Sequence, residues 1–168
     1  NSDSLFEGCS SLKSINLDCF DTSKVKSMRS MFNKCQSLTS ISLRSFNTQN
    51  VKDISNMFDY CLSLIEVDLS SFNTQNVTNM SNIFDSCLSL IEVDLSSFNT
   101  INVESMNSVF KNCESLKKIN LMNFDTKNVK DMSSMFIGCK ALEEIKINFD
   151  GKSVEHMGYM FRQCNALK

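Results

Sequence analysis

Cysteine is the residue type of this chain with the clearest capacity for chemistry. There are eight cysteines in 168 residues, and seven of them recur at nearly constant spacing, at positions 9, 35, 61, 87, 113, 139 and 164. Such a column, placed at the end of an apolar stretch, predicts buried free thiols, because a free cysteine packs as a small hydrophobic side chain. Disulfides between successive members are the alternative, although seven members cannot all pair. No Cys-x-x-Cys motif or nearby histidine accompanies the column, so we expect no metal site.

Two further residues invite a chemical interpretation. Cys19 lies outside the column, where later repeats carry Ser or Asn, so we expect it to be exposed and to be the first thiol to react. His156 is the only histidine, which leaves little for acid–base or metal catalysis, and we expect it on the surface. No phosphate-binding loop, dinucleotide fingerprint or Gly-x-Ser-x-Gly motif occurs. The sequence therefore predicts no enzyme, no catalytic residue and no cofactor.

The charge and hydropathy of the chain exclude two classes of partner. The formal net charge is −2, whereas a nucleic-acid surface needs clustered Lys and Arg. No apolar run approaches the roughly 18–20 residues that span a bilayer, and no signal peptide is recognised at the start. We therefore expect no nucleic acid and no membrane insertion by this segment, which is interpreted as an excerpt of a longer secreted or anchored chain.

The spacing of the cysteines extends to the whole sequence. The steps from Cys9 to Cys35 and from Cys35 to Cys61 are both 26 residues, and columns of Phe, Leu and Met or Ile follow the same period. The fourteen residues CLSLIEVDLSSFNT occur at 61–74 and again at 87–100. A fixed period of about 20–50 residues indicates stacked structural units. The sequence thus predicts one solenoid over residues 1–168, with about six and a half coils.

Residues 35–60 represent one coil and contain two kinds of pattern. Apolar and polar residues alternate around Ile41 and Leu43, which favours a short strand. The second half has the spacing of one helical face, at Val51, Ile54, Met57, Phe58 and Cys61. Asn50 stands where a helix N-cap would, with Asp53 in the first turn. We therefore expect a short helix or 3₁₀ segment after Asn50.

These elements predict an α/β solenoid built like leucine-rich repeats. Helical segments need more room than strands, which lie about 4.8 Å apart. We therefore expect a right-handed, curved stack with short parallel strands on the concave side and short helical or 3₁₀ segments on the convex side. An all-β solenoid is the alternative.

Two stretches carry a resemblance to a known family. The pattern LxxIxL at residues 12–17 returns in later coils and resembles the leucine-rich-repeat signature. SFNTQNVTNMSNIFDSCLSL at 71–90 resembles the BspA-like class of leucine-rich repeats of bacterial and protist surface proteins, and the match runs along the whole chain. The resemblance implies adhesion or surface display, and an extracellular or cell-surface location.

One departure from ordinary leucine-rich repeats concerns the turn after the strand. Phe occupies the position where other leucine-rich repeats place an Asn that bonds to the turn backbone. The replacement hydrogen bonds are expected from a column of threonines and from the Asn or Asp before each of them. These threonines are Thr22, Thr48, Thr74, Thr100 and Thr126.

Outward positions of the strands supply the candidate binding residues. They are Ser42, Arg44, Glu66, Asp68, Glu92, Asp94, Lys118 and Asn120. The four acids among them form a patch on two adjacent coils, suited to a basic partner or a cation, or copied without function by the duplication. Core columns are nearly constant while these positions vary, which favours a binding module for a protein or glycan on a host or neighbouring cell. A structural spacer that projects another domain is the alternative.

Overall fold

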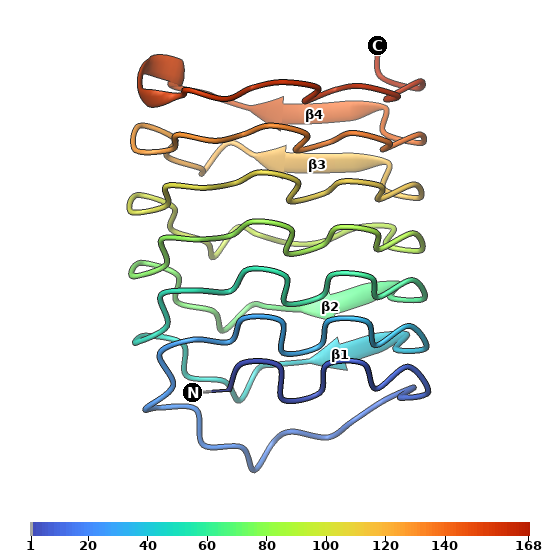
Figure 1. Cartoon of the computed structure of the whole chain (residues 1–168), viewed down its shortest axis with the longest axis vertical. Coiled ribbons are helices and arrows are strands. Elements are labelled where there is room, and N and C mark those ends of the chain that lie inside the picture. The colour runs from blue at the N-terminus through green and yellow to red at the C-terminus, as the bar shows by residue number, and fades with distance from the viewer. Residues whose placement is uncertain (1) are drawn as a thin grey trace.

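The computed structural model describes residues 2–168 as a stack of coils that runs from the N-terminal to the C-terminal end (Figure 1). Its strands are β1 (Ser40–Ser42), β2 (Glu66–Asp68), β3 (Lys118–Leu121) and β4 (Glu144–Ile147), and one 3₁₀ turn, η1, covers Gly151–Ser153. β1 pairs with β2 and β3 with β4, in both cases in parallel. Equivalent residues of neighbouring coils lie opposite each other, as Ser40 does with Glu66. The predicted solenoid with short parallel strands is confirmed.

The interior of the stack is built from the repeated columns. Seven phenylalanine rings, from Phe6 to Phe161, stack with centroids between 5.3 and 5.7 Å apart. In the second Phe column, Phe72 and Phe98 stack at 6.2 Å. Because each ring is covered by its equivalent in the next coil, the phenylalanine rings of the middle coils are buried. Aromatic pairs of this kind add about 0.5–1.5 kcal/mol to the stabilisation from buried area.

The second half of each coil is not helical, so the predicted helical segments are wrong. Residues 50–61 form consecutive tight turns, in which Asn56 and Tyr60 have φ of 56° and 57°. Every second N–H donates to a carbonyl of the next coil, as Phe58 N does to Ile83 O at 2.9 Å. An α-helix would need these donors within its own segment. The apolar residues at this spacing are instead the ones whose side chains point into the core from successive turns.

Asn50 and Asp53 accordingly do not cap a helix. The Asn50 side chain donates to Ser23 O of the preceding coil at 2.8 Å. Asp53 Oδ1 accepts a hydrogen bond from Ser55 N at 2.8 Å, closing a turn within the same coil. Both side chains therefore hold turns in place rather than begin a helix.

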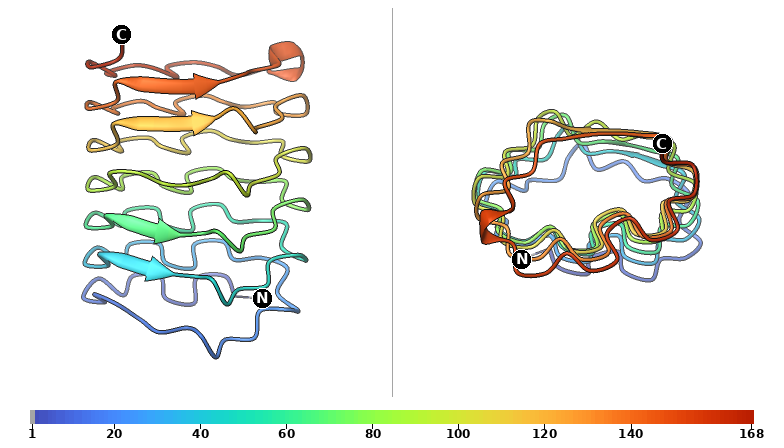
Figure 2. Two further views of the ribbon diagram at one scale, coloured as in Figure 1. Left: turned by 180° about the vertical axis from the view of Figure 1, so that it is seen from behind. Right: turned by 90° about the horizontal axis from the view of Figure 1, so that it is seen from above.

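The stack is straight, so the expected curvature is also wrong. Parallel bridges run without a break along the turn side, joining Ser27, Asp53, Asn79, Ser105, Asp131 and His156. On the strand side, β1 pairs with β2 and β3 with β4. Figures 1 and 2 show coils that lie nearly parallel. We call one flat side the strand face (residues 40–44, 66–70, 92–96, 118–122 and their equivalents). We call the other the turn face (residues 50–61 and their equivalents in the other coils).

Candidate binding surface

The strand face brings all eight predicted residues together around three adjoining hollows. The largest, of about 540 Å³, is lined by Arg44, Glu66, Asp68, Glu92 and Asp94 with the backbone between them. A hollow of about 400 Å³ lies on β1 and β2 and includes Ser42. A third, of about 260 Å³, includes Lys118 and Asn120. The predicted residues thus share one continuous surface.

Two of the four acids already serve the fold. Asp68 Oδ1 accepts hydrogen bonds from Ser70 Oγ at 2.7 Å and Ser70 N at 3.1 Å. Asp94 Oδ1 accepts from Ser96 N at 2.9 Å. Bonds from Ser70 and from Ser96 lower the pKa of Asp68 and of Asp94 respectively. These carboxylates therefore close the turn after the strand, as Asn120 Oδ1 does by accepting from Met122 N.

The other two acids keep their carboxylates available. Within residues 2–168, neither Glu66 nor Glu92 has a side-chain hydrogen bond or an ion pair, and both are exposed. Arg44 instead pairs with Asp68. Lys118 pairs with Glu144 at 3.6 Å, an exposed contact of little energy. Glu66 and Glu92 are therefore the acceptors that this face offers to a partner.

The strand ladder is interrupted where the acids meet. Residues 92–94 form no strand and have no ladder hydrogen bond to β2 or β3. Equal charges on neighbouring strands oppose pairing, and Glu66 and Asp68 stand one coil from Glu92 and Asp94. The segment 14–16 is also unpaired and carries no acid, so charge repulsion alone does not explain open ladders. The interruption leaves the largest hollow between the two acidic coils.

An apolar feature beside the acids was missed by the sequence interpretation. Leu88, Ile65 and Ile91 are 36%, 45% and 48% exposed. Ile65 and Ile91 line a hollow of about 510 Å³ together with Lys117 and Ala141. Comparison of coils at these outward positions would have found it, because the neighbouring coils carry polar residues there.

The cysteine column is buried in the middle of the stack. Five members are buried, namely Cys35, Cys61, Cys87, Cys113 and Cys139, and all eight thiols are free. Each column thiol from the second coil on donates to a Phe carbonyl, as Cys61 Sγ does to Phe32 O at 3.2 Å. Burial raises the pKa of Cys35 to about 11 and that of Cys139 to about 12. Burial of the column is confirmed for these five members, whereas Cys164 in the last coil is half-buried and Cys9 in the first coil is exposed. Cys19, outside the column, is exposed as expected.

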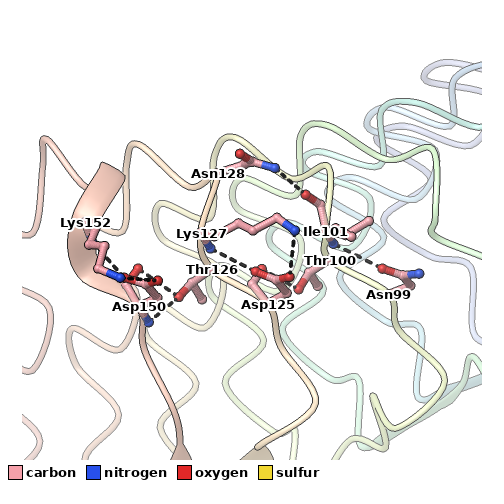
Figure 3. A network of polar contacts seen from close by, with 9 residues as sticks. All are labelled: Asn99, Thr100, Ile101, Asp125, Thr126, Lys127, Asn128, Asp150 and Lys152. Carbon is pink, nitrogen blue, oxygen red and sulfur yellow. Dashed lines mark hydrogen bonds and ion pairs between the residues drawn. The ribbon is translucent and has the colours of Figure 1, made fainter.

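The threonine column performs the turn role predicted for it. Thr100 Oγ1 donates to Asp125 O of the next coil at 2.9 Å, and Thr126 Oγ1 donates to Asp150 O at 3.2 Å (Figure 3). Asp125 Oδ1 in turn accepts from Lys127 N at 3.0 Å. Buried hydroxyls and Asx turns therefore replace the asparagine of ordinary leucine-rich repeats.

The other residues considered for chemistry form no catalytic or metal site within residues 2–168. His156 is exposed in a bridge position beside Asp131. Residues 2–168 contain no group of three or more His, Cys, Asp and Glu side chains placed to hold a metal ion. Among the same residues, no helix has the length and apolar character to cross a membrane.

The coils define a leucine-rich-repeat solenoid. A crystal structure of a T. pallidum leucine-rich repeat protein superposes with a TM-score of 0.67 at 24% identity, over 99% of this chain and 70% of that one. The resemblance to BspA-like repeats is thereby confirmed at the level of the fold. A family model described as "Mycoplasma protein of unknown function, DUF285" matches residues 1–119 and 64–168. The chain belongs to this family.

Two further solved structures align with most of this chain but superpose poorly. One is a leucine-rich repeat protein from Bacteroides ovatus, with 18% identity over 98% of this chain and 68% of that one and a TM-score of 0.27. The other is a leucine rich cell surface protein from Faecalibacterium prausnitzii, with 20% identity over 99% and 67% and a TM-score of 0.30. A search of curated proteins finds no match.

Proposed function

We propose that this protein is a non-enzymatic binding or adhesion module, displayed outside the cell, whose strand face binds a protein or glycan partner. The observation that carries the proposal is the pair of carboxylates, Glu66 and Glu92, that have no partner within residues 2–168 and lie beside the 540 Å³ hollow. The face is held by stacked coils, so ordering it on binding costs little entropy. It offers no Trp or Tyr anchor, so each contact is weak and salt-sensitive, and many copies on a surface strengthen attachment.

The test is to reverse the two free charges. In Glu66→Lys/Glu92→Lys, Asp68 and Asp94 keep closing their turns, so the protein is expected to fold with wild-type circular dichroism. Capture on protein and glycan arrays should fall by about tenfold or more, the size expected for loss of a charged contact. The control, Glu104→Lys/Glu155→Lys, changes two exposed acids on the turn face, of which Glu104 pairs with Lys130, and should bind as wild type. A folded strand-face variant with unchanged capture overturns the proposal.

A structural spacer is the second candidate. The continuous bridges of the turn face and the uninterrupted Phe stack make a straight, stiff rod. A spacer keeps its role when the charges of Glu66 and Glu92 are reversed, and loses it when its length changes. Cell attachment measured for the reversal variant and for a chain shortened by one coil separates the two functions.

A further inference from the structure

Four aliphatic side chains lie at the corner between the turn face and the strand face. They are Leu62 and Ile65 in one coil and Leu88 and Ile91 in the next, and we call them the aliphatic corner. Leu62 is half-buried and the other three are exposed. Ile91 N donates to Ile65 O at 3.4 Å, which stacks the two coils directly. The corner is therefore a continuous apolar row along the stack.

The fold does not require aliphatic residues at these positions. The preceding coil carries Gln36 and Thr39 there, and the following coil carries Glu114 and Lys117. Both coils keep the same buried Phe, Cys and Leu columns. Exposed apolar residues that are dispensable for the core and gathered on one site are characteristic of interaction surfaces.

The charges beside the corner limit the chemistry of its partner. Glu66 and Glu92 follow Ile65 and Ile91 in sequence, and within residues 2–168 their carboxylates have no partner. An apolar row and an acidic row therefore run side by side along the stack. A complementary surface has an aliphatic row beside a row of Lys or Arg. A glycan fits poorly, because the aliphatic row offers its hydroxyls no hydrogen-bond partner.

The spacing of the coils favours a helix over a strand as the bound element. Rings of successive coils lie 5.5 Å apart from Phe32 to Phe58 and 5.7 Å apart from Phe58 to Phe84. One turn of an α-helix rises about 5.4 Å, whereas two residues of a strand rise about 6.6 Å. A helix along the stack axis therefore places side chains three or four residues apart over successive coils.

We infer that the partner of the strand face is a protein that docks a basic amphipathic helix along the aliphatic corner, with its aliphatic row on Leu62, Ile65, Leu88 and Ile91 and its basic row on Glu66 and Glu92. The inference rests on the proposed function and names the class of partner for it. The helix lies parallel to the stack and spans the two duplicated coils. The hollow beside Ile65 and Ile91 receives its aliphatic side chains.

The experiment uses a defined probe and variants taken from the chain itself. The probe is a covalently constrained helical peptide of about 14 residues, because a free helix of that length is marginal in water; it carries one Leu row and one adjacent Lys row. A scrambled peptide and a peptide with Glu for Lys are its controls. The test variant is Leu62→Gln/Ile65→Thr/Leu88→Gln/Ile91→Thr, which gives both coils the residues of the coil before them. The matched control, Ile101→Thr/Met122→Thr, removes two exposed apolar residues elsewhere.

Wild type and the matched control should bind the Leu/Lys peptide, measured by fluorescence anisotropy. The corner variant and both control peptides should bind about tenfold more weakly or worse, the usual size of a hot-spot truncation. Equal peptide binding by a folded corner variant overturns the inference, as does equal binding of the scrambled peptide. If array capture depends on Glu66 and Glu92 but not on the corner, the inference fails while the proposed function stands. If capture depends on neither, the proposed function fails as well.

Discussion

At the scale of single residues, Asp59 has the least satisfied environment in the described chain. Asp59 Oδ1 and Asn33 Oδ1, one coil away, are the two buried side-chain polar atoms without a hydrogen-bond partner in residues 2–168. In the next coil, the Asp85 carboxylate accepts from Lys111 Nζ at 2.9 Å. Burial, and then the charge of Asp85, raise the pKa of Asp59 to about 6, with Lys111 and Lys34 opposing them. A proton on Asp59 removes this uncompensated charge.

Asp59 should therefore make the protein more stable in mild acid. Its folded pKa lies above the unfolded value of about 3.9, so between about pH 4 and 6 the native state binds more protons. Stability then falls as pH rises through this window. In Asp59→Asn, the free energy of unfolding should change less from about pH 4 to pH 7, as measured by urea denaturation. Glu155→Gln, at an exposed site on the turn face, is the control, and an Asp59→Asn curve that still follows wild type contradicts the prediction.

The thiols should react in the order of their exposure. Cys9 and Cys19 are exposed, whereas Cys61 and Cys87 are buried and their pKa values are raised by burial. Only the thiolate reacts, so both access and ionisation protect the inner column. Timed alkylation of the native protein, read by mass spectrometry, should label Cys9 and Cys19 first. Early labelling of Cys87 would mean that the turn side of the coil opens to solvent.

At the scale of the repeated elements, each coil is joined to the next by buried threonine hydroxyls. Thr74 Oγ1 donates to Asn99 O at 2.9 Å and accepts from Asn99 N at 2.8 Å. The same pair of bonds recurs between Thr48 and Asn73. Since the hydroxyl satisfies a backbone donor and an acceptor at once, no methyl group of the same shape can replace it.

Thr74→Val should therefore destabilise the stack at constant volume. Two backbone groups of Asn99 lose their partner, which costs about 1–3 kcal/mol for a buried site. Thr78→Val is the control, because Thr78 is exposed and its hydroxyl donates one exposed hydrogen bond, to Lys52 O at 3.3 Å, so its loss should change stability by less than about 0.5 kcal/mol. Denaturant unfolding of both variants gives the comparison, and equal losses would show that the hydroxyl bridge contributes nothing specific.

At the scale of the whole molecule, the solenoid is held together by contacts between neighbouring coils. Each coil packs on its two neighbours through the same Phe, Cys and Thr columns. Stability of such a stack is approximately a sum over coils and the interfaces between them. Length can then change by whole coils without disturbing the register of the rest.

Deletion of residues 61–86 should leave a folded, shorter stack, because Tyr60 then joins Cys87 and every column keeps its order. The m-value, which is the slope of the unfolding free energy against denaturant concentration, should fall by about a seventh, in proportion to the surface lost. Deletion of residues 61–73 removes half a coil, so that the strand segment of one coil would stack on the turn segment of the next. This variant should not unfold cooperatively. A shorter deletion that folds as well as the whole-coil deletion would contradict the stacked register.

The sequence by itself determined the period, the inward columns and the turn chemistry. Stacking places equivalent residues on top of one another, so the burial of Phe58 and Cys61 follows from spacing alone. The helix prediction failed because apolar residues at Val51, Ile54 and Met57 suit a helix and a series of inward turns equally. Only the neighbouring coil decides between them, by accepting the backbone hydrogen bonds that a helix would keep.

The shape of the face and the apolar row beside it also belong to the tertiary structure. The bridges of the turn face join successive coils in parallel from Ser27 to His156, and the stack is straight, although the strand ladder is interrupted at residues 92–94. Asp68 and Asp94 were predicted to face a partner, yet only the folded turns showed that their carboxylates are already engaged. Comparison of the coils marks Ile65 and Ile91 as unusual, and the structure shows that both are exposed beside a hollow. Sequence spacing specifies what lies inside a solenoid, and backbone pairing between coils decides how its outside is presented.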